Sequence, residues 1–409
     1  MTTPTDPARV PRFPGIRLRM TGRAPAEENR VSSPLELLFD LTFVVAIAQV
    51  ASQLAQYIAR GEAVAGVGPY LMVFFAIWWA WMNFTWFASA YDTDDVPYRL
   101  LTLVQMGGVL VLAAGVPSGF DAQKFTAITI GYVIMRIAQV SQWVRAAVEH
   151  PDGRTTALRY AVGISLVQVG WVARLTLPPE AGLWSFLVLA AADLSVPLWA
   201  ERTGMTAWHP HHIAERYGLF TIIVLGESVA AATLGVQQGI DHSGLTVPLV
   251  TIAASSLILL FALWWLYFLE PAGAGLEAHR GLSFFWGYGH YFVFASLAAL
   301  GAGLEVAVER GAGRIETPDA VVGYAVAIPV AVFLVMLWVL HAPLVDQLVI
   351  RPVAIVVATA AVLLLPLASP VIGLEGTVVG IAGVAAALTA VTIVDRSYRA
   401  SRKLTTEES

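Results

Sequence analysis

Two carboxylates stand at the start of a stretch that otherwise has the composition of a membrane span. The segment SSPLELLFDLTFVVAIAQ (32–49) contains Glu36 and Asp40, and residues 41–59 carry no charged side chain. Their spacing places both acids on one face of a helix. Glu36 also suits the positive end of a helix dipole. Asp40 lies one turn deeper, where an unpaired charge costs several kcal/mol, so we expect it to have a partner or a function.

A second acidic helix start lies in HPHHIAERYGLFTIIVLGES (209–228). Glu215 and Arg216 mark the beginning of the apolar run, and Glu227 follows twelve residues after Glu215. That separation is about 18 Å along a helix, which brings Glu227 close to the centre of a bilayer. We therefore expect Glu227 to be protonated, paired with another helix or hydrated in a cavity.

Two further ionisable residues lie in the middle of apolar runs, Arg136 in YVIMRIAQ and Asp193 in LAAADLSVP. An arginine at this depth requires an acid, and Glu227 and Asp193 are the candidates. We expect Glu227 to approach Arg136 or Asp193 within the reach of a hydrogen bond or one water. The deep and helix-start residues together form a candidate substrate or proton relay: Glu36, Asp40, Arg136, Asp193, Glu215, Arg216 and Glu227.

A third group is a candidate acid or metal cluster made of Asp92, Asp94, Asp95 and His212. The sequence DTDD has the form of an acidic motif of one terpene-cyclase class, and clustered carboxylates can hold magnesium. A solvated loop is the competing interpretation. The spacing of the nearby histidines lacks the i, i+4 geometry of helical metal pairs. The sequence assigns no metal with confidence and identifies no cofactor.

The composition identifies the kind of protein that carries these residues. The chain is 57% hydrophobic and 13% charged, with a mean hydropathy of +0.69, whereas soluble domains have about 25% charged residues. An all-α, polytopic integral membrane protein is therefore predicted, with the lipid bilayer as a partner and no nucleic-acid partner. The absence of cysteine excludes disulfides and thiolate chemistry.

Twelve apolar stretches are long enough to cross about 30 Å of hydrocarbon. With the N-terminus inside, 18 of the 24 lysines and arginines face the cytoplasm, which predicts that both termini are cytoplasmic. The expected spans are residues 36–59, 66–88, 99–117, 124–147, 157–176, 181–200, 213–235, 246–269, 283–304, 319–341, 350–369 and 376–394.

The two halves of the chain resemble each other weakly. LELLFDLTFVVAIAQV (35–50) aligns with AERYGLFTIIVLGESV (214–229), and each is followed by a tryptophan-rich stretch and then a small-residue stretch. Since each half has six helices, two parallel repeats are predicted, a plan known from transporters. The predicted divisions are a disordered basic tail (1–31), two six-helix repeats (32–204 and 205–398) and a cytoplasmic tail (399–409).

Three segments resemble the bacterial low-temperature-requirement A family: ELLFDLTFV (36–44), WMNFTWFASAYDTDD (81–95) and HIAERYGLFTIIVLGES (212–228). The resemblance covers Ser32 to about Tyr398, and Leu38 replaces one of the family's aromatic residues. It implies a polytopic protein of the bacterial inner membrane that is linked to growth at low temperature, without a defined biochemical activity. The residues on the family's polar positions are Glu36, Asp40, Asp92, Asp94, Asp95, Arg136, His212, Glu215, Arg216 and Glu227.

Three functions compete at this point. The first is an ion-coupled transporter of a small molecule, with buried carboxylates as the relay. The alternative is a membrane enzyme that acts on a lipid or isoprenoid through the acidic cluster. The third is a structural or stress-adaptation protein without a small-molecule site. A homo-oligomer is compatible with each. The opening of the largest polar cavity should discriminate between the first two functions. A water-accessible cavity at the midplane favours transport, and a lateral opening at the cytoplasmic leaflet favours lipid chemistry.

Overall fold

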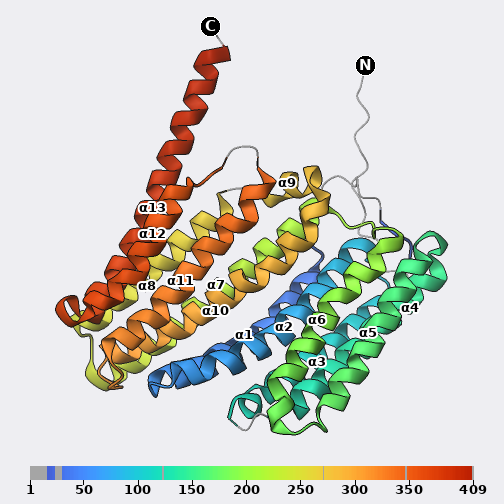
Figure 1. The fold of residues 1–409 in the computed structure, drawn as a ribbon, viewed down its shortest axis with the longest axis horizontal. Helices are drawn as coiled ribbons and strands as arrows, with labels where there is room; N and C mark the ends of the chain where they lie inside the picture. The colour runs from blue at the N-terminus through green and yellow to red at the C-terminus, as the bar shows by residue number, and fades with distance from the viewer. Residues whose placement is uncertain (1–15, 24–29, 122–123, 270, 346–347, 408–409) are drawn as a thin grey trace.

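The structure, a computed structural model, describes residues 16–23, 30–121, 124–269, 271–345 and 348–407. These residues form a bundle of long helices (Figure 1). The helices are α1 (Pro34–Ala59), α2 (Ala63–Tyr91), α3 (Val96–Asp121), α4 (Thr126–Glu149), α5 (Arg154–Arg174), α6 (Gly182–Ala200), α7 (Pro210–Ser243), α8 (Val247–Phe268), α9 (Ala272–Ala278), α10 (Ser283–Gly311), α11 (Asp319–His341), α12 (Pro352–Leu364) and α13 (Ser369–Glu407).

Local sequence signals fix the starts of the two helices that carry the acidic motifs. At α1, Ser33 and Glu36 form a reciprocal capping box, and Pro34 occupies the first helical position. At α7, the His209 side chain accepts a hydrogen bond from the backbone N–H of His212, and Pro210 follows it. Both helices therefore begin at defined residues, which fixes the depth of the acids that follow.

Ten helical stretches of the described chain are long and apolar enough to cross a membrane. They include α1 to α3, α5 to α8, α10 and α11, and one stretch that joins α12 to α13. The predicted twelve spans would also require α4 to cross and α12 and α13 to cross separately, so the number twelve stays a prediction. The chain is a multi-pass, all-helical membrane protein.

The described ends of the chain lie on the same side of the bundle, which we call the terminus side (Figure 1). The starts of α1, α3 and α7 lie there, as do the ends of α2, α4 and α6, because successive long helices alternate in direction. We call the other side of the bundle the opposite side. This arrangement defines the depth of each polar residue without assuming which side is cytoplasmic.

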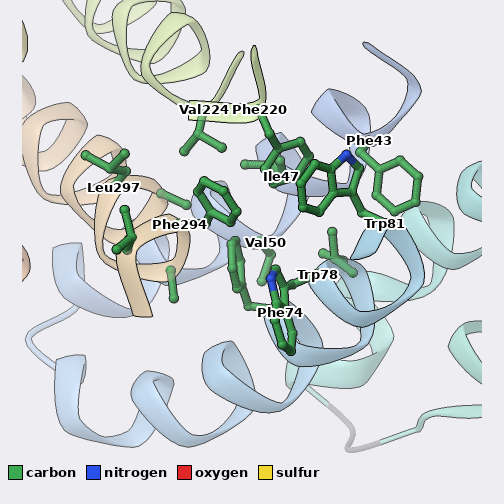
Figure 2. Close-up of a cluster of buried hydrophobic side chains, with 14 of the residues drawn as sticks. Phe43, Ile47, Val50, Phe74, Trp78, Trp81, Phe220, Val224, Phe294 and Leu297 are labelled. Carbon is green, nitrogen blue, oxygen red and sulfur yellow. The ribbon is translucent and has the colours of Figure 1, made fainter. Parts of the chain in front are cut away.

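The two halves of the chain meet where α1 and α2 pack against α7 and α10. Figure 2 shows the apolar core at this contact, with Phe43 and Ile47 from α1, Trp81 from α2 and Phe220 from α7. The rings of Trp81 and Phe220 are stacked with their centroids 4.2 Å apart. Large buried side chains therefore fill the centre of the contact between the halves.

The small-residue stretches allow two helices to pack closely in each half of the chain. A Cβ atom added to Gly108 of α3 would lie 2.7 Å from the carbonyl oxygen of Gly131 on α4, and one added to Gly303 of α10 would collide with the backbone of α11 at Ala325. Helix α3 thus packs on α4 as α10 packs on α11. This correspondence agrees with two parallel repeats, which otherwise remain a prediction.

The basic segment before α1 differs from the disordered tail that we expected over residues 1–31. Residues 16–23 lie along the terminus side, where the Leu18 N–H donates to Asp95 and the Met20 N–H donates to Glu149. The Met20 side chain is completely buried. These residues are thus held in place, because Asp95, just before α3, and Glu149, at the end of α4, accept hydrogen bonds from their backbone and arginine donors. The rest of 1–31, apart from 30–31, lies outside the described residues.

Candidate functional site

Four charged or titratable side chains from α1 and α7 meet at the terminus side of the contact between the halves. We call Glu36, Asp40, His212 and Arg216 the interface cluster. Arg216 contacts both oxygens of Asp40, at 2.6 and 3.0 Å, and its Nη1 lies 3.0 Å from Glu36 Oε1. His212 Nε2 lies 3.1 Å from the same Glu36 oxygen. Each of the four side chains is at most 1% exposed, so this is a dry network of opposite charges.

Neighbouring groups from α2 and the start of α1 complete the interface cluster. The indole N–H of Trp81 donates to Asp40 at 2.7 Å, and Arg216 also donates to the Thr85 hydroxyl at 3.4 Å. The backbone N–H of Ser33 donates to Glu36 at 2.7 Å. Asp40 thus has three strong donors and no access to water, which suits a fixed ion pair that joins the halves.

Glu215 lies beside the interface cluster and is not part of it. Its carboxylate accepts a hydrogen bond from the backbone N–H of Ser32 at 3.2 Å, just before α1 begins. It is partly exposed, as its position at the start of α7 predicts. Glu215 therefore ties the start of the first half to the start of the second half.

Arg136 and Asp193 meet in the interior of the first half, and we call them the mid-membrane pair. Arg136 Nη2 lies 3.4 Å from Asp193 Oδ1, and both side chains are 4% exposed. Arg136 also donates to Gln139 at 2.7 Å and to the Tyr132 hydroxyl at 3.1 Å. The indole N–H of Trp171 donates to Asp193 at 2.7 Å. The contact between the two charges is long, and each charge has other partners.

Glu227 does not join the mid-membrane pair, so the geometric prediction for this residue is wrong. Within the described part of the chain, its carboxylate accepts no hydrogen bond and pairs with no cation. The carboxylate of Glu305 on α10 is close enough to interact electrostatically with Glu227. Helix α7 packs on α10 and α1 and does not pack closely on α4. The side chain is half-buried instead of fully buried.

Two cavities flank the mid-membrane pair along the same four helices. The opposite-side cavity, of about 40 Å³, is lined by Val73 and Ala76 of α2, Tyr132 of α4, Trp171 of α5 and Phe186 of α6 among others. The terminus-side cavity, of about 30 Å³, is lined further along these helices by Trp79, Asn83, Trp143, Tyr160 and Pro197, by Glu201 just after α6, and by Ser283 and Phe284 of α10.

The order along each helix places the mid-membrane pair between the two cavities. On α4 the order is Tyr132, Arg136 and Trp143, and on α6 it is Phe186, Asp193 and Pro197. Tyr132 and Trp171 line the opposite-side cavity and hydrogen-bond to the pair as well. The pair therefore lies between the two cavities along these helices.

The three aspartates after α2 do not assemble a common site. Asp94 pairs with Arg99 at 2.7 Å, Asp95 with Arg145 at 2.5 Å, and Asp92 lies 3.8 Å from Arg23. His212, the fourth member of the expected cluster, faces Glu36 instead. In the described ranges, no three His, Asp or Glu side chains are placed to hold a metal ion together. Each acid is occupied by its own arginine, which sequence spacing could not show.

The electrostatic environments of Asp92 and Asp95 differ although the residues are close in sequence. Burial raises the pKa of Asp92 to about 6, and the negative charge of Glu36 adds to this shift. Burial alone would raise the pKa of Asp95, but hydrogen bonds from Arg145 and from the Leu18 and Tyr98 amides outweigh it and lower the pKa to about 2. Asp95 is a fixed anchor for the N-terminal segment, whereas Asp92 titrates near neutrality.

Several residues that complete these sites were not identified from the sequence. Trp171, Tyr132 and Gln139 support the mid-membrane pair, and Glu201 lines the terminus-side cavity. Tyr132 and Gln139 are four and three residues from Arg136, on its own face of α4, so helical spacing could have found them. Nothing in the sequence indicates that Trp171 reaches Asp193 from another helix.

These features define a polytopic helical membrane protein with charges buried between its helices. The sequence matches the bacterial low temperature requirement A protein (LtrA) family over residues 31–391, and the chain belongs to this family. It is also similar to an uncharacterized protein of Rhizobium meliloti (strain 1021), with 25% identity over 252 residues. That match covers 59% of this chain and 59% of the length of that relative.

Proposed function

We propose that this protein is an ion-coupled transporter of a small molecule, with its path through the first six-helix half. The single observation that carries the proposal is the sequence of cavity, buried ion pair and cavity along α2, α4, α5 and α6. Alternating access requires a site that opens to one side while a closed element blocks the other. The mid-membrane pair supplies the closed element.

Coupling to an ion follows from the chemistry of the pair. A proton or another cation on Asp193 would remove its attraction for Arg136, whose contact with it is already long at 3.4 Å. Arg136 would keep its bonds to Tyr132 and Gln139, so the arginine would not be left unpaired. Asp193 is thus the relay acid that we favour, with Glu227 as a second carboxylate open to exchange. Asp40 and Glu36 join the halves and hold them in register.

Transport is preferred over lipid chemistry for a specific reason. A lipid-acting enzyme would need Asp92, Asp94 and Asp95 to converge on a headgroup, and each of them is paired with a different arginine. The proposed partners are therefore a bilayer and a small-molecule substrate. We further propose an inner-membrane location with the terminus side in the cytoplasm, in line with the distribution of positive charge.

Site-directed labelling tests the proposal without knowledge of the substrate. The chain has no cysteine, so single-cysteine variants have no background. Ala76→Cys reports on the opposite-side cavity and Asn83→Cys on the terminus-side cavity. A membrane-impermeant maleimide should label each variant from its own side only, in right-side-out and inside-out vesicles. Labelling of neither residue from either side, in correctly folded protein, would contradict a transport path here.

A further inference from the structure

The walls of the terminus-side cavity are aromatic. Trp143 and Tyr160 stack with their ring centroids 4.1 Å apart, and the rings of Trp86 and Trp208 lie 5.0 Å apart. All four residues line the cavity. Aromatic faces carry negative electrostatic potential and attract cations, and cages of this kind recognise quaternary ammonium groups. The surface thus favours an organic cation over a neutral or anionic ligand.

A carboxylate completes the charge complementarity of this cavity. Glu201 accepts hydrogen bonds from the Tyr160 hydroxyl at 2.8 Å, and from the backbone N–H and hydroxyl of Thr206 at 2.6 and 2.9 Å. These donors are all neutral. Among the described residues that line the cavity there is no Lys, Arg or His, and the structure describes no ion pair for Glu201 in the same ranges. The negative charge is held in place and has no cation of its own.

A protein cation already uses one of these aromatic walls. The guanidinium carbon of Arg280 lies 4.9 Å from the centre of the Trp208 ring, although Arg280 does not line the cavity. The opposite-side cavity differs, because Arg174 lines it and stacks on Phe125. A cationic ligand is therefore favoured in the terminus-side cavity and disfavoured in the opposite-side cavity.

We infer that the terminus-side cavity binds a small organic cation of the quaternary ammonium class, held by the aromatic walls and by Glu201. This inference rests on the proposed function, since it names the class of substrate that would enter the path from the terminus side.

Binding measurements on the purified full chain test the inference with a matched pair of probes. Choline carries a quaternary ammonium, and 3,3-dimethylbutan-1-ol has the same shape without the charge. Isothermal titration should show binding of choline and a dissociation constant at least about tenfold higher for the neutral alcohol, as expected if charge provides the recognition. Equal binding of both probes, or binding of neither, would overturn the inference.

Variants locate the binding within the cavity. Glu201→Gln keeps the shape and removes the charge, and it should weaken choline binding by about tenfold. Its control is Glu180→Gln, at an exposed acid near the start of α6. Trp86→Leu should weaken binding by about three- to tenfold, with Trp184→Leu, at a residue 71% exposed, as its control. Unchanged affinity in both cavity variants would overturn the assignment, and Trp86→Leu still tests it if Glu201→Gln folds poorly.

Flux measurements separate this inference from the proposed function. Choline binding that depends on Glu201, without any choline flux in proteoliposomes, would support the site and count against transport. If the maleimide labels each cavity from its own side but choline does not bind, the result would support transport and overturn the cation site.

Discussion

The interface cluster and the mid-membrane pair both bury opposite charges, but their surroundings differ. The cluster is closed: Arg216 holds Asp40 through two contacts of 2.6 and 3.0 Å, and the apolar core of Figure 2 lies next to it. The pair has one contact of 3.4 Å between its charges and a cavity on each side. Burial of charge alone therefore does not identify a transport site, and adjacent space is the feature that separates the two.

The largest effect should come from the interface cluster. Arg216→Ala leaves Glu36 and Asp40 buried without their main cation, and breaking a buried pair from one side costs about 3–5 kcal/mol. Folded yield and the unfolding temperature, measured by fluorescence-detected size exclusion with heating, should fall sharply. Arg202→Ala, at an exposed arginine, is the control and should behave like the parent protein. A folded, stable Arg216→Ala variant would contradict a joining role for the cluster.

Two tryptophans offer a matched comparison between the sites. Trp81 and Trp171 each donate to a buried carboxylate at 2.7 Å, and phenylalanine removes that donor and the same part of the ring at both positions. Trp81→Phe should destabilise the protein by about 1.5–3 kcal/mol, the range for hydrogen bonds to charged groups. Trp171→Phe should destabilise it less, because the adjoining cavity can supply water to Asp193, and should increase labelling of Ala76→Cys from the terminus side. If the two variants had identical effects on stability and on labelling of Ala76→Cys, the proposed difference between the interface cluster and the mid-membrane pair would be contradicted.

Asp92, which lies at the terminus side and outside the membrane spans, should make the stability of the protein depend on pH. The pKa of Asp92 is raised from 3.8 to about 6, chiefly by burial and also by Glu36. The folded state therefore binds more protons than the unfolded state between about pH 4 and 6, and stability falls as pH rises through this window, by on the order of 2 kcal/mol. Arg30, Arg23 and Asp94 also act on this group.

The test of this pH dependence is the unfolding temperature measured from pH 4 to pH 7. Asp92→Asn should flatten the decline, since an amide does not titrate. Asp95→Asn should not flatten it, because Asp95 has a pKa of about 2 and is ionised throughout the window. A decline that persists unchanged in Asp92→Asn would assign it to another group.

The smallest effect should come from a charge pair at the surface. Asp94 and Arg99 are 46% and 43% exposed in their side chains and lie 2.7 Å apart. Exposed pairs contribute about 0–1 kcal/mol, and asparagine tolerates the positive φ of 48° at this position. Asp94→Asn should shift the unfolding temperature by little more than the error of the measurement. A large loss would mean that this acid has a role that its paired, exposed position does not suggest.

Much of the architecture could be predicted from the sequence, and the reasons are local. Composition and apolar runs identified the multi-pass helical class, and Ser33, Pro34 and Glu36 set the start of α1. Asp193, which pairs with Arg136, was one of the two partners predicted for this arginine, since a buried arginine needs an acid. The prediction of Glu227 as the other partner was wrong, because the depth of a residue along its helix does not show which face of that helix a neighbouring helix covers.

The rest of the candidate site depends on contacts between distant helices. The interface cluster joins residues 176 positions apart in sequence, and neither acid of α1 indicates in its own motif that Arg216 is its partner. The docking of residues 16–23 depends on Asp95, just before α3, and on Glu149 at the end of α4. The cavities form where side chains of α2, α4, α5 and α6 leave space between them, a property of packing that hydrophobic periodicity does not record.

The most direct test of the central claim is the labelling of Ala76→Cys from the terminus side, with and without Asp193→Asn. If the mid-membrane pair closes the path, the loss of the aspartate charge should raise this labelling rate by about tenfold, which corresponds to about 1.4 kcal/mol in the equilibrium between closed and open states. Asp40→Asn, which removes a charge from the closed interface cluster, should leave the rate in folded protein unchanged. An unchanged rate in Asp193→Asn, or an equal increase in Asp40→Asn, would contradict the account.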